Sequence, residues 1–310
     1  MEKKYNVLII GSGPAGITAS IYTIRANLST FVVAGGMPGG QLMLTTDVED
    51  FPGFPGGLQG PELMNRMRKQ AEMFGVKFLD KDVTKIEKTK NGFIIFVGNE
   101  KYKAKAVIVA TGSSASWLGI ESEKKLIGRG VSACATCDGP LFKNKDVAVI
   151  GGGDTAVRET LFLSKFCKSV TLIHRKGNLR AQNILQDRVF KIKNVKFLWN
   201  TEAKEFIGEG RLESLKVINH KTKKISNLKL DGVFVAIGHT PNTKFLKGVV
   251  KLDSHGYIIV KDYVNTSLKG IFAAGDVHDY RYQQAVTAAG AGCMAAMEAD
   301  EYINSLKHRK

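Results

Sequence analysis

Two cysteines separated by two residues form the clearest chemical pattern in this 310-residue chain. Cys134 and Cys137 lie in the segment SACATCDG, and Asp138 follows at once. Two intervening residues let both sulfur atoms reach disulfide distance within one local turn. A thiol at a helix start has a depressed pKa, because the dipole favours the thiolate that attacks disulfides. We therefore interpret the pair as a redox couple with Asp138 as general acid or base. An aspartate that only caps a turn is the alternative.

The two remaining cysteines argue against a metal clamp. A structural zinc site needs four ligands, usually as two close pairs, whereas Cys167 and Cys293 stand alone in apolar helical surroundings. A secreted disulfide framework would need more cysteines in a much smaller chain. We expect no metal site, and we expect Cys167 and Cys293 to pack as small apolar residues.

A glycine-rich turn near the N-terminus predicts a nucleotide site. The apolar segment 5–10 runs into GSGPAG and then into a helical pattern, which gives the order strand, turn, helix. The glycines of the pattern are Gly11, Gly13 and Gly16. They permit a tight turn, a close approach of pyrophosphate and close helix packing, in that order. Ala34 stands where an acid would hold the adenosine ribose, so the ribose must be held in another way.

The same pattern occurs a second time in the middle of the chain. The strand 147–150 is followed by GGGDTA, a helical pattern and the strand VTLIH. The turn positions are Gly151, Gly153 and Ala156, with alanine as an accepted variant in the third place. The second strand ends in a group of cations, Arg175, Lys176 and Arg180. Such a cluster suits a 2′-phosphate, so we expect NADPH rather than NADH.

Two nucleotide units in one chain predict an α/β protein with two domains. The apolar strands 106–112 and 271–277 both end where a cofactor can lie beside an open sheet. We expect a discontinuous first domain with a second domain inserted, and the chain to cross between them in two turn-rich segments. The expected domains are 1–114 with 245–310, and 115–244. Small antiparallel hairpins are expected over 77–97 and 213–229.

The formal net charge of +16 comes mostly from lysines scattered over the whole chain. We interpret this charge as a solvated surface, with a field that attracts an acidic protein as the alternative. The sequence contains no recognisable nucleic-acid module, and no apolar run is long enough for a membrane span. The N-terminal apolar run breaks at Gly11 without a cleavage site, so we expect a cytoplasmic protein.

Together these motifs resemble those of the low-molecular-weight thioredoxin reductases. The shared segments are GSGPAG, GGMPGGQL, ACATCDG, GGGDTA, HRK with a later arginine, AIGHTPNT, FAAGDV and QAVTAAGAGCMAA, in the order of the family. The resemblance covers about residues 5–303. It implies two Rossmann-like three-layer domains, with the NADPH domain inserted into the FAD domain, and a homodimer.

The resemblance also implies a role for each matching residue. FAD would lie on the first glycine turn and contact Gly39, Gly40, Gln41, Leu42, Asp276, Gln284 and Ala285. NADPH would lie on the second turn, with the cations on its 2′-phosphate. Electrons would pass from NADPH through the flavin to a Cys134–Cys137 disulfide and then to thioredoxin. Cys137 would face the flavin, and Cys134 would attack the partner disulfide. A hinge rotation between the domains would let nicotinamide and disulfide each meet the flavin.

Three positions depart from the family pattern, although none removes a reacting group. Gln283 replaces a common arginine, Lys176 replaces a second arginine, and Asp50 replaces a common asparagine. Two other hypotheses also remain open. The dithiol could serve a different disulfide acceptor, or the chain could be a nucleotide-sensing scaffold with an idle cysteine pair.

Overall fold

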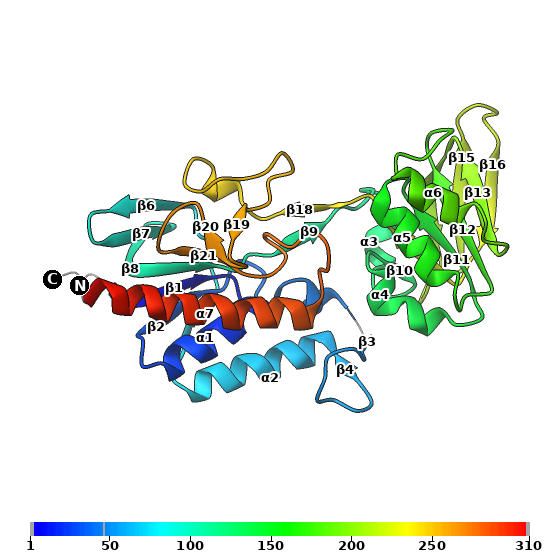
Figure 1. Cartoon of the computed structure of the whole chain (residues 1–310). Coiled ribbons are helices and arrows are strands. Elements are labelled where there is room, and N and C mark those ends of the chain that lie inside the picture. The colour runs from blue at the N-terminus through cyan, green and yellow to red at the C-terminus, as the bar shows by residue number, and fades with distance from the viewer. Residues whose placement is uncertain (1–2, 46, 308–310) are drawn as a thin grey trace. The chain divides into compact units, whose positions relative to one another are not determined.

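The computed structural model describes residues 3–45 and 47–307, and the chain divides into two compact units (Figure 1). Unit 1 contains Met1–Ser114 and Thr240–Lys310, and unit 2 contains Ala115–His239. Unit 2 is therefore an insertion in the sequence of unit 1. Which nucleotide each unit binds stays a prediction.

A nine-stranded sheet forms the centre of unit 1. Its parallel part has the order β21, β8, β1, β2, β5, with the bounds β1 (Lys3–Ile10), β2 (Thr30–Val33), β5 (Lys77–Leu79), β8 (Glu100–Val109) and β21 (Ile271–Ala273). Antiparallel strands extend it, namely β6 (Lys85–Thr89), β7 (Gly92–Val97), β19 (Val260–Lys261) and β20 (Asn265–Thr266). Two short strands pair apart from it, β3 (Asp47–Val48) and β4 (Leu58–Gln59).

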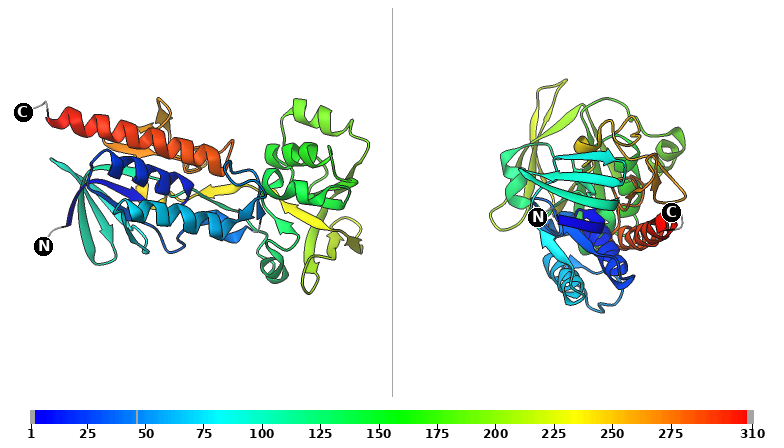
Figure 2. Two further views of the ribbon diagram at one scale, coloured as in Figure 1. Left: turned by 90° about the horizontal axis from the view of Figure 1, so that it is seen from below. Right: turned by 90° about the vertical axis from the view of Figure 1, so that its left-hand side faces the viewer.

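Three helices lie side by side on one face of this sheet (Figures 1 and 2). They are α1 (Pro14–Arg25), α2 (Gly60–Met73) and α7 (Ala285–Lys307). Short 3-10 helices occur at η1 (Gly40–Leu44) and η3 (Lys244–Leu246). Gly292 lets α7 approach α1 closely, because a Cβ atom there would lie 2.1 Å from the carbonyl oxygen of Ala15.

Strand β1 shows why its sequence is apolar without alternation. Val7 and Ile9 point into the core beneath the helices, whereas Leu8 and Ile10 point into a second core on the other face. The hairpin strands β6 and β7 and the segment 245–258 cover that second face. Both faces of the parallel strands are thus buried, which requires a continuous apolar run.

Unit 2 repeats this arrangement on a smaller scale. Its parallel sheet has the order β10, β17, β11, β12, β13, with the bounds β10 (Val131–Ser132), β11 (Asp146–Ile150), β12 (Ser169–His174), β13 (Val195–Trp199) and β17 (Gly232–Val235). Its helices are α3 (Glu121–Leu126), α4 (Ala135–Asp138), η2 (Gly139–Phe142), α5 (Asp154–Leu163) and α6 (Asn183–Val189). An antiparallel sheet adds β14 (Thr201–Ile207), β15 (Ser214–Asn219) and β16 (Ile225–Lys229).

The sheet of unit 2 also separates two cores. Val147 and Val149 face α4, α5 and α6, whereas Ala148 and Ile150 face the antiparallel sheet. Each unit is therefore a three-layer structure of helices, parallel sheet and antiparallel strands. The predicted α/β class with two Rossmann-like units is confirmed.

The two predicted hairpins have different outcomes. Strands β15 and β16 form an antiparallel hairpin within 213–229, as predicted. The prediction for 77–97 was partly wrong, since only β6 and β7 form a hairpin there. Residues 77–79 instead form β5, which pairs in parallel with β2 at the sheet edge. Short strands carry little periodicity, so alternation alone did not separate β5 from the hairpin.

The chain passes between the units in two short strands that pair with each other, β9 (Ser113–Ala115) and β18 (His239–Pro241). Within the ranges that the structure describes, no helix is long and apolar enough to cross a membrane. In the same ranges, no three His, Cys, Asp or Glu residues gather as a metal site would require.

Candidate active site

The redox candidate is a closed disulfide at the start of α4. Cys134 and Cys137 are bonded, with their Cα atoms 5.4 Å apart. Cys134 is the N-cap residue, and its Sγ accepts a hydrogen bond of 3.2 Å from the backbone N–H of Cys137. The hydroxyl of Ser132 accepts a 3.0 Å bond from the N–H of Cys134 and fixes the entry into the turn. A thiolate formed at Cys134 would therefore already have a hydrogen-bond donor.

Two carboxyl groups lie close to this turn. Asp138 ends α4, and its backbone N–H donates to the carbonyl of Cys134 over 3.1 Å. Glu159 on α5 accepts a 3.3 Å hydrogen bond from the N–H of Ala135, the residue after Cys134. Burial, and secondly the charge of Asp138, raise the pKa of Glu159 to about 7.

The second glycine turn lies between β11 and α5 of the same unit. The backbone N–H of Gly151 donates a hydrogen bond to the carbonyl of Ile173 on β12. A Cβ atom on Gly151 would lie 2.3 Å from the carbonyl oxygen of Ala236. The same Cβ atom would lie 2.7 Å from Cβ of Ala156, which shows how closely the third motif position packs. A Cβ atom on Gly153 would meet no atom within 4 Å. Because no side chain caps α5 at Gly153, its first N–H groups face open space suited to a phosphate.

The structure brings the predicted cations to this turn. The N–H of Arg180 donates a 2.7 Å hydrogen bond to the carbonyl of Gly152, and the N–H of Gln182 donates to Asp154 over 2.8 Å. These bonds tie the loop that follows β12 to the glycine turn. The cationic side chains on this loop are exposed and make no ion pair with any described residue; they are Arg175, Lys176 and Arg180.

His174 packs directly against the glycine turn. A Cβ atom on Gly152 would lie 2.2 Å from Cε1 of the buried His174 ring. Burial lowers the pKa of His174, and the charges of the nearby cations lower it further. A neutral ring that supports the turn agrees with its position better than acid–base work.

The first glycine turn in unit 1 has a similar shape. Gly11 has φ +106°, and a Cβ atom there would lie 2.2 Å from the carbonyl oxygen of Ala110 at the end of β8. A Cβ atom on Gly16 would lie 2.0 Å from the carbonyl oxygen of Gly11, so the helix must pack with glycine at this position. A Cβ atom on Gly13 would meet no atom within 4 Å, and no side chain caps the N-terminus of α1. These features suit a pyrophosphate.

A predicted loop folds over this turn. The hydroxyl of Ser12 donates to the carbonyl of Ala34 and accepts from the N–H of Gly39, both over 3.0 Å. Sequence reasoning missed Ser12, although it is the variable residue inside the glycine motif. A Cβ atom on Gly40 would lie 3.8 Å from Cα of Gly13. The other two predicted residues of this segment follow in η1; they are Gln41 and Leu42.

The third predicted segment of unit 1 follows β21. Gly275 lies beside α1, since a Cβ atom there would be 3.1 Å from Cβ of Ala15. Burial, and secondly the charge of Asp279, raise the pKa of Asp276 to about 7. A largely buried carboxyl beside a glycine turn suits a ligand that brings hydroxyl groups.

At the start of α7, the side chain of Gln284 bonds its own loop instead of standing free for the predicted cofactor contact. Ala285 is its first residue, but the side-chain amide of Gln284 donates to carbonyls of its own loop, at Tyr282 and Gln283. The backbone of Gln283 has φ +51°, and its amide donates to Ser113 over 3.3 Å. The structure thus brings the glycine turn, the Gly39 segment and Asp276 together in unit 1, whereas the side chain of Gln284 bonds within its own loop.

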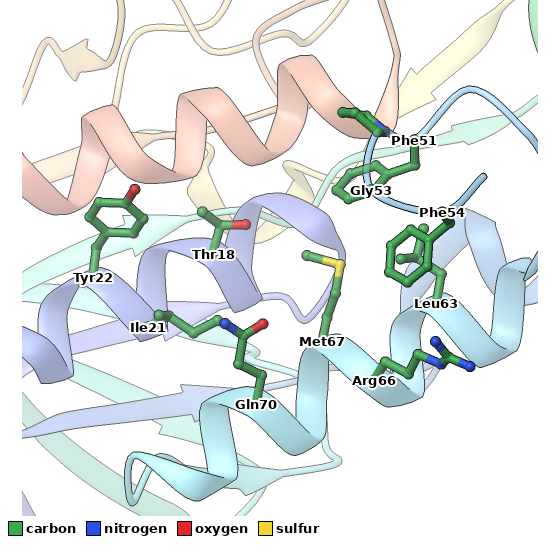
Figure 3. A pocket seen from close by; sticks show the side chains of 11 residues that line it. Thr18, Ile21, Tyr22, Phe51, Gly53, Phe54, Leu63, Arg66, Met67 and Gln70 are labelled. Atoms are coloured by element: carbon green, nitrogen blue, oxygen red, sulfur yellow. The ribbon is translucent and has the colours of Figure 1, made fainter. Parts of the chain in front are cut away.

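A separate cavity of about 400 Å³ lies between α1 and α2 (Figure 3). Phe51 and Phe54 from the segment between β3 and β4 close one end of it, and Arg66 lies over the ring of Phe54. Tyr22 on α1 is part of its lining and is 47% exposed. None of the predicted site residues lines this cavity.

Known proteins resemble this chain in sequence and in fold. The family model described as pyridine nucleotide-disulphide oxidoreductase matches residues 5–292. A thioredoxin reductase of Rickettsia conorii is 49% identical over 309 residues, which cover 98% of this chain and 100% of that protein. The NADPH-dependent thioredoxin reductase 3 of Arabidopsis thaliana is 47% identical over 97% of this chain and 58% of its own length. The crystal structure of thioredoxin reductase from Streptococcus pyogenes has a TM-score of 0.94 and 41% identity, covering 98% of this chain and 100% of that chain.

The chain belongs to the thioredoxin reductases of the pyridine nucleotide-disulphide oxidoreductase family. The resemblance stated from the motifs is confirmed, and so is the prediction of an enzyme that acts on disulfides. In a thioredoxin reductase, the disulfide at α4 is the natural candidate for the redox group. The scaffold hypothesis has no support from this membership.

Glu159 is the residue that sequence reasoning missed most clearly. It lies three residues after Ala156 and four before Leu163, and both of these are fully buried. Positions at this spacing share one helix face. An acid on the buried face of a predicted helix, next to a nucleotide turn, was therefore a signal available in the sequence.

Proposed function

We propose that the protein reduces the disulfide of thioredoxin with electrons from NADPH, by way of FAD and the Cys134–Cys137 pair. The observation that carries the proposal is the closed Cys134–Cys137 disulfide in the same unit as a glycine turn flanked by unpaired cations. Relatives that match nearly the whole chain are named for reduction of thioredoxin, and one of them for its dependence on NADPH.

Unit 1 has the features that FAD requires, so we assign the flavin to unit 1, whose second segment begins at Thr240 rather than at the predicted residue 245. The open N-terminus of α1 would hold the pyrophosphate, and the Gly39 segment tied to Ser12 would cover it. The buried carboxyl of Asp276 would accept a hydrogen bond from a hydroxyl of the ribityl chain. Bound FAD would supply two-electron transfer between a nicotinamide and a disulfide. Because Gln284 bonds its own loop, its predicted contact with the flavin needs its side chain to turn.

Unit 2 has the features that NADPH requires, so we assign the nicotinamide cofactor to the inserted domain, predicted as 115–244. The open N-terminus of α5 would hold the pyrophosphate. Arg175 and Arg180 can each donate a fork of hydrogen bonds to a phosphate, whereas Lys176 adds a point charge. Their side chains have no competing acid among the described residues, so they are available to a 2′-phosphate.

The two cysteines have different surroundings, and this supports different roles. The N–H of Cys137 donates to Sγ of Cys134, which would stabilise a thiolate there after reduction. Cys134 would then attack the thioredoxin disulfide and form a mixed disulfide, while Cys137 would receive electrons from the flavin side. Asp138 lies next in sequence to Cys137 and would transfer the proton that the leaving sulfur needs.

The reaction needs the two units to move relative to each other, because nicotinamide and disulfide must both reach one flavin ring. The links are suited to this, since each is a short strand preceded by a glycine with positive φ. Gly112 has φ +63° and Gly238 has φ +112°, and a Cβ atom on either would meet nothing within 4 Å. We therefore propose a hinge at β9 and β18.

We also propose a homodimer that functions in the cytoplasm. Exposed apolar side chains on neighbouring helices support a protein contact, with Tyr22 at 47%, Met294 at 40% and Met297 at 58% exposure. Tyr22 on α1 lies next to Cys293 on α7, so the exposed groups belong to one surface. Sedimentation analysis would show a dimer of about twice the chain mass, and a monomer at all concentrations would contradict this assignment.

One assay tests the proposed function. Purified protein with bound flavin should oxidise NADPH only when an oxidised thioredoxin is present, and the Cys134→Ser variant should lose this activity by at least about 1000-fold. Cys293→Ser is the matched control, because that cysteine forms no disulfide and lies in the other unit. Turnover with another disulfide acceptor but not with thioredoxin would support the alternative acceptor. Full activity of Cys134→Ser would overturn the proposal.

A further inference from the structure

The carboxyl group of Glu159 is buried beneath the redox turn and is only partly satisfied. Its Oε1 accepts the single hydrogen bond from Ala135, and its Oε2 is buried with no hydrogen-bond partner among the described residues. A buried carboxyl group with one unsatisfied oxygen costs free energy, and a role in the chemistry of the redox turn would account for its presence. The proposed reaction as described above gives Glu159 no task.

The hydrogen bond from Ala135 places this carboxyl next to the redox pair. The nitrogen of Ala135 belongs to the peptide group of Cys134, and Ala135 is 1% exposed. Helices α4 and α5 lie next to each other in unit 2 (Figure 1). The carboxyl group therefore contacts the peptide before α4 directly, with no solvent between them to screen its charge. A negative charge on Glu159 would act on any charge that forms at Cys134.

Burial and one negative charge favour the neutral form of Glu159, and one hydrogen bond opposes them. Burial is the largest influence on its pKa, which lies at about 7, and the negative charge of Asp138 on α4 raises it further. The bond from Ala135 has the opposite effect. The other elements that contact α5 carry further titratable or charged residues, but of the described side chains only Asp138 has a marked charge effect on Glu159. Those residues are Asp146 on β11, His174 on β12, and Asp187 and Arg188 on α6.

We propose that Glu159 is a positioning residue that sets the pH dependence of the Cys134–Cys137 couple by sharing one negative charge with the Cys134 sulfur. The proposal deepens the proposed function and rests on it. Opening the disulfide consumes two electrons, and one proton goes to the Cys137 sulfur. The second proton lies on Cys134 when Glu159 is a carboxylate, or on Glu159 when Cys134 is a thiolate. The two groups therefore titrate as one coupled pair.

This sharing changes how the reduced state depends on pH. Below pH 7 a neutral Glu159 leaves the Cys134 thiol free to ionise. Above pH 7 the carboxylate opposes a second negative charge beside it and raises the pKa of that thiol. Since ionisation of a thiol favours the reduced state, the carboxylate makes the disulfide harder to reduce at high pH.

The test is the redox equilibrium of the purified protein with dithiothreitol, which is itself oxidised to its cyclic disulfide. The fraction of opened Cys134–Cys137 is measured by alkylation and mass spectrometry at pH 6 and pH 8. Glu159→Gln keeps an oxygen that can accept from Ala135 but removes the charge. We expect this variant to match the unchanged protein at pH 6. At pH 8 we expect about a tenfold shift towards the dithiol, which corresponds to about 30 mV.

Two further variants keep the result decisive. Glu121→Gln is the matched control, because its side chain is 90% exposed in the same unit. Asp138→Asn removes the charge that raises the pKa of Glu159, so the pH at which the equilibrium changes should move down. This variant also tests the proposal if Glu159→Gln does not fold. An equal shift at both pH values would show a structural role for Glu159, and no shift at either would also overturn the proposal.

The equilibrium needs neither nicotinamide nor thioredoxin, so it separates the two proposals. A pH-dependent shift in a protein that fails to reduce thioredoxin would support the role of Glu159 and contradict the acceptor. Normal reduction of thioredoxin without a pH-dependent shift would support thioredoxin as the acceptor and contradict the role of Glu159. A pH profile of Cys134 alkylation by iodoacetamide adds a direct readout, in which Glu159→Gln should lower the apparent pKa of the thiol.

Discussion

The backbone N–H of Arg180 donates a 2.7 Å hydrogen bond to the carbonyl oxygen of Gly152. This bond joins the loop after β12 to the glycine turn before α5. A neighbouring bond, from the N–H of Gln182 to the side chain of Asp154, joins the same two segments across 28 residues of sequence. The geometry of the cations relative to the turn is therefore set by the backbone and does not depend on side-chain packing alone. The charge of the proposed phosphate site can therefore be changed by side-chain substitutions without disturbing the backbone that holds it.

The first prediction concerns coenzyme choice. Replacing Arg180 by alanine leaves its backbone bond to Gly152 intact but removes the proposed charge-assisted contact with the 2′-phosphate. Such contacts contribute about 1.5–3 kcal/mol, so KM for NADPH should rise by about 10-fold to 150-fold. The constants for NADH should change little, because NADH lacks that phosphate. Steady-state rates with both coenzymes would show this, with the exposed Lys221→Ala of the same unit as control. An equal loss with NADH would contradict a phosphate contact.

The second prediction concerns the contact between the glycine turn and His174. A Cβ atom on Gly152 would lie 2.2 Å from the buried His174 ring, so Gly152→Ala should overpack this site. We expect a loss of about 1–3 kcal/mol in the free energy of unfolding, seen as a lower thermal midpoint. Gly210→Ala is the matched control, since a Cβ atom there would meet nothing within 4 Å. The double variant with His174→Ala should recover part of the loss, and no recovery would assign the cost to another contact.

The third prediction follows from the buried carboxyl of Asp276. Its pKa lies at about 7 in the folded protein, above the ordinary value for an aspartate. Its contribution to stability is therefore present at low pH and is lost as the pH rises through about 7, where the buried group must ionise. In flavin-free protein, Asp276→Asn should raise the urea midpoint more at pH 8 than at pH 5. Glu301→Gln, an exposed acid on α7, should show no such dependence. A gain that is equal at both pH values would contradict the raised pKa.

The sequence predicted those parts of the protein in which only one residue type can meet a local physical requirement. Glycine at a close backbone approach, as at Gly11 and Gly151, has no substitute, so both glycine turns were recognised at the correct positions, while their binding of nucleotides stays a prediction. The paired cysteines and the apolar strands with both faces buried carried equally direct signals. The repeat of the turn then predicted two domains with one α/β architecture.

The parts that sequence could not predict depend on contacts between distant segments. Ser12 acquires its role only when the Gly39 segment folds over it, and no local pattern reports that contact. Strand β5 was merged with a hairpin because three residues carry too little periodicity to show parallel pairing. The partners of Gln284 were also not predictable, because its amide bonds its own loop in the structure.

The last prediction concerns the connection between the units, where Asn242 fastens the segment that follows β18. Its amide donates to the carbonyl of Thr111 over 2.9 Å, and its side-chain oxygen lies 3.1 Å from the hydroxyl of Ser114. Its backbone N–H donates to Gly112 over 3.0 Å. Asn242→Ala removes both side-chain bonds, which together contribute about 1–3 kcal/mol.

Because Asn242 ties the two crossing segments to each other beside Gly112, its loss should free the proposed hinge without unfolding either unit. We expect the backbone amide of Asn242 to exchange with solvent about 5-fold to 100-fold faster, as its local opening becomes easier by that free energy. Amides in β1 and β11 should keep their protection. Hydrogen exchange followed by mass spectrometry measures both, with Asn304→Ala on α7 as control. Faster exchange throughout unit 1 would show instead that Asn242 supports the fold of the unit as a whole, and that the hinge begins elsewhere.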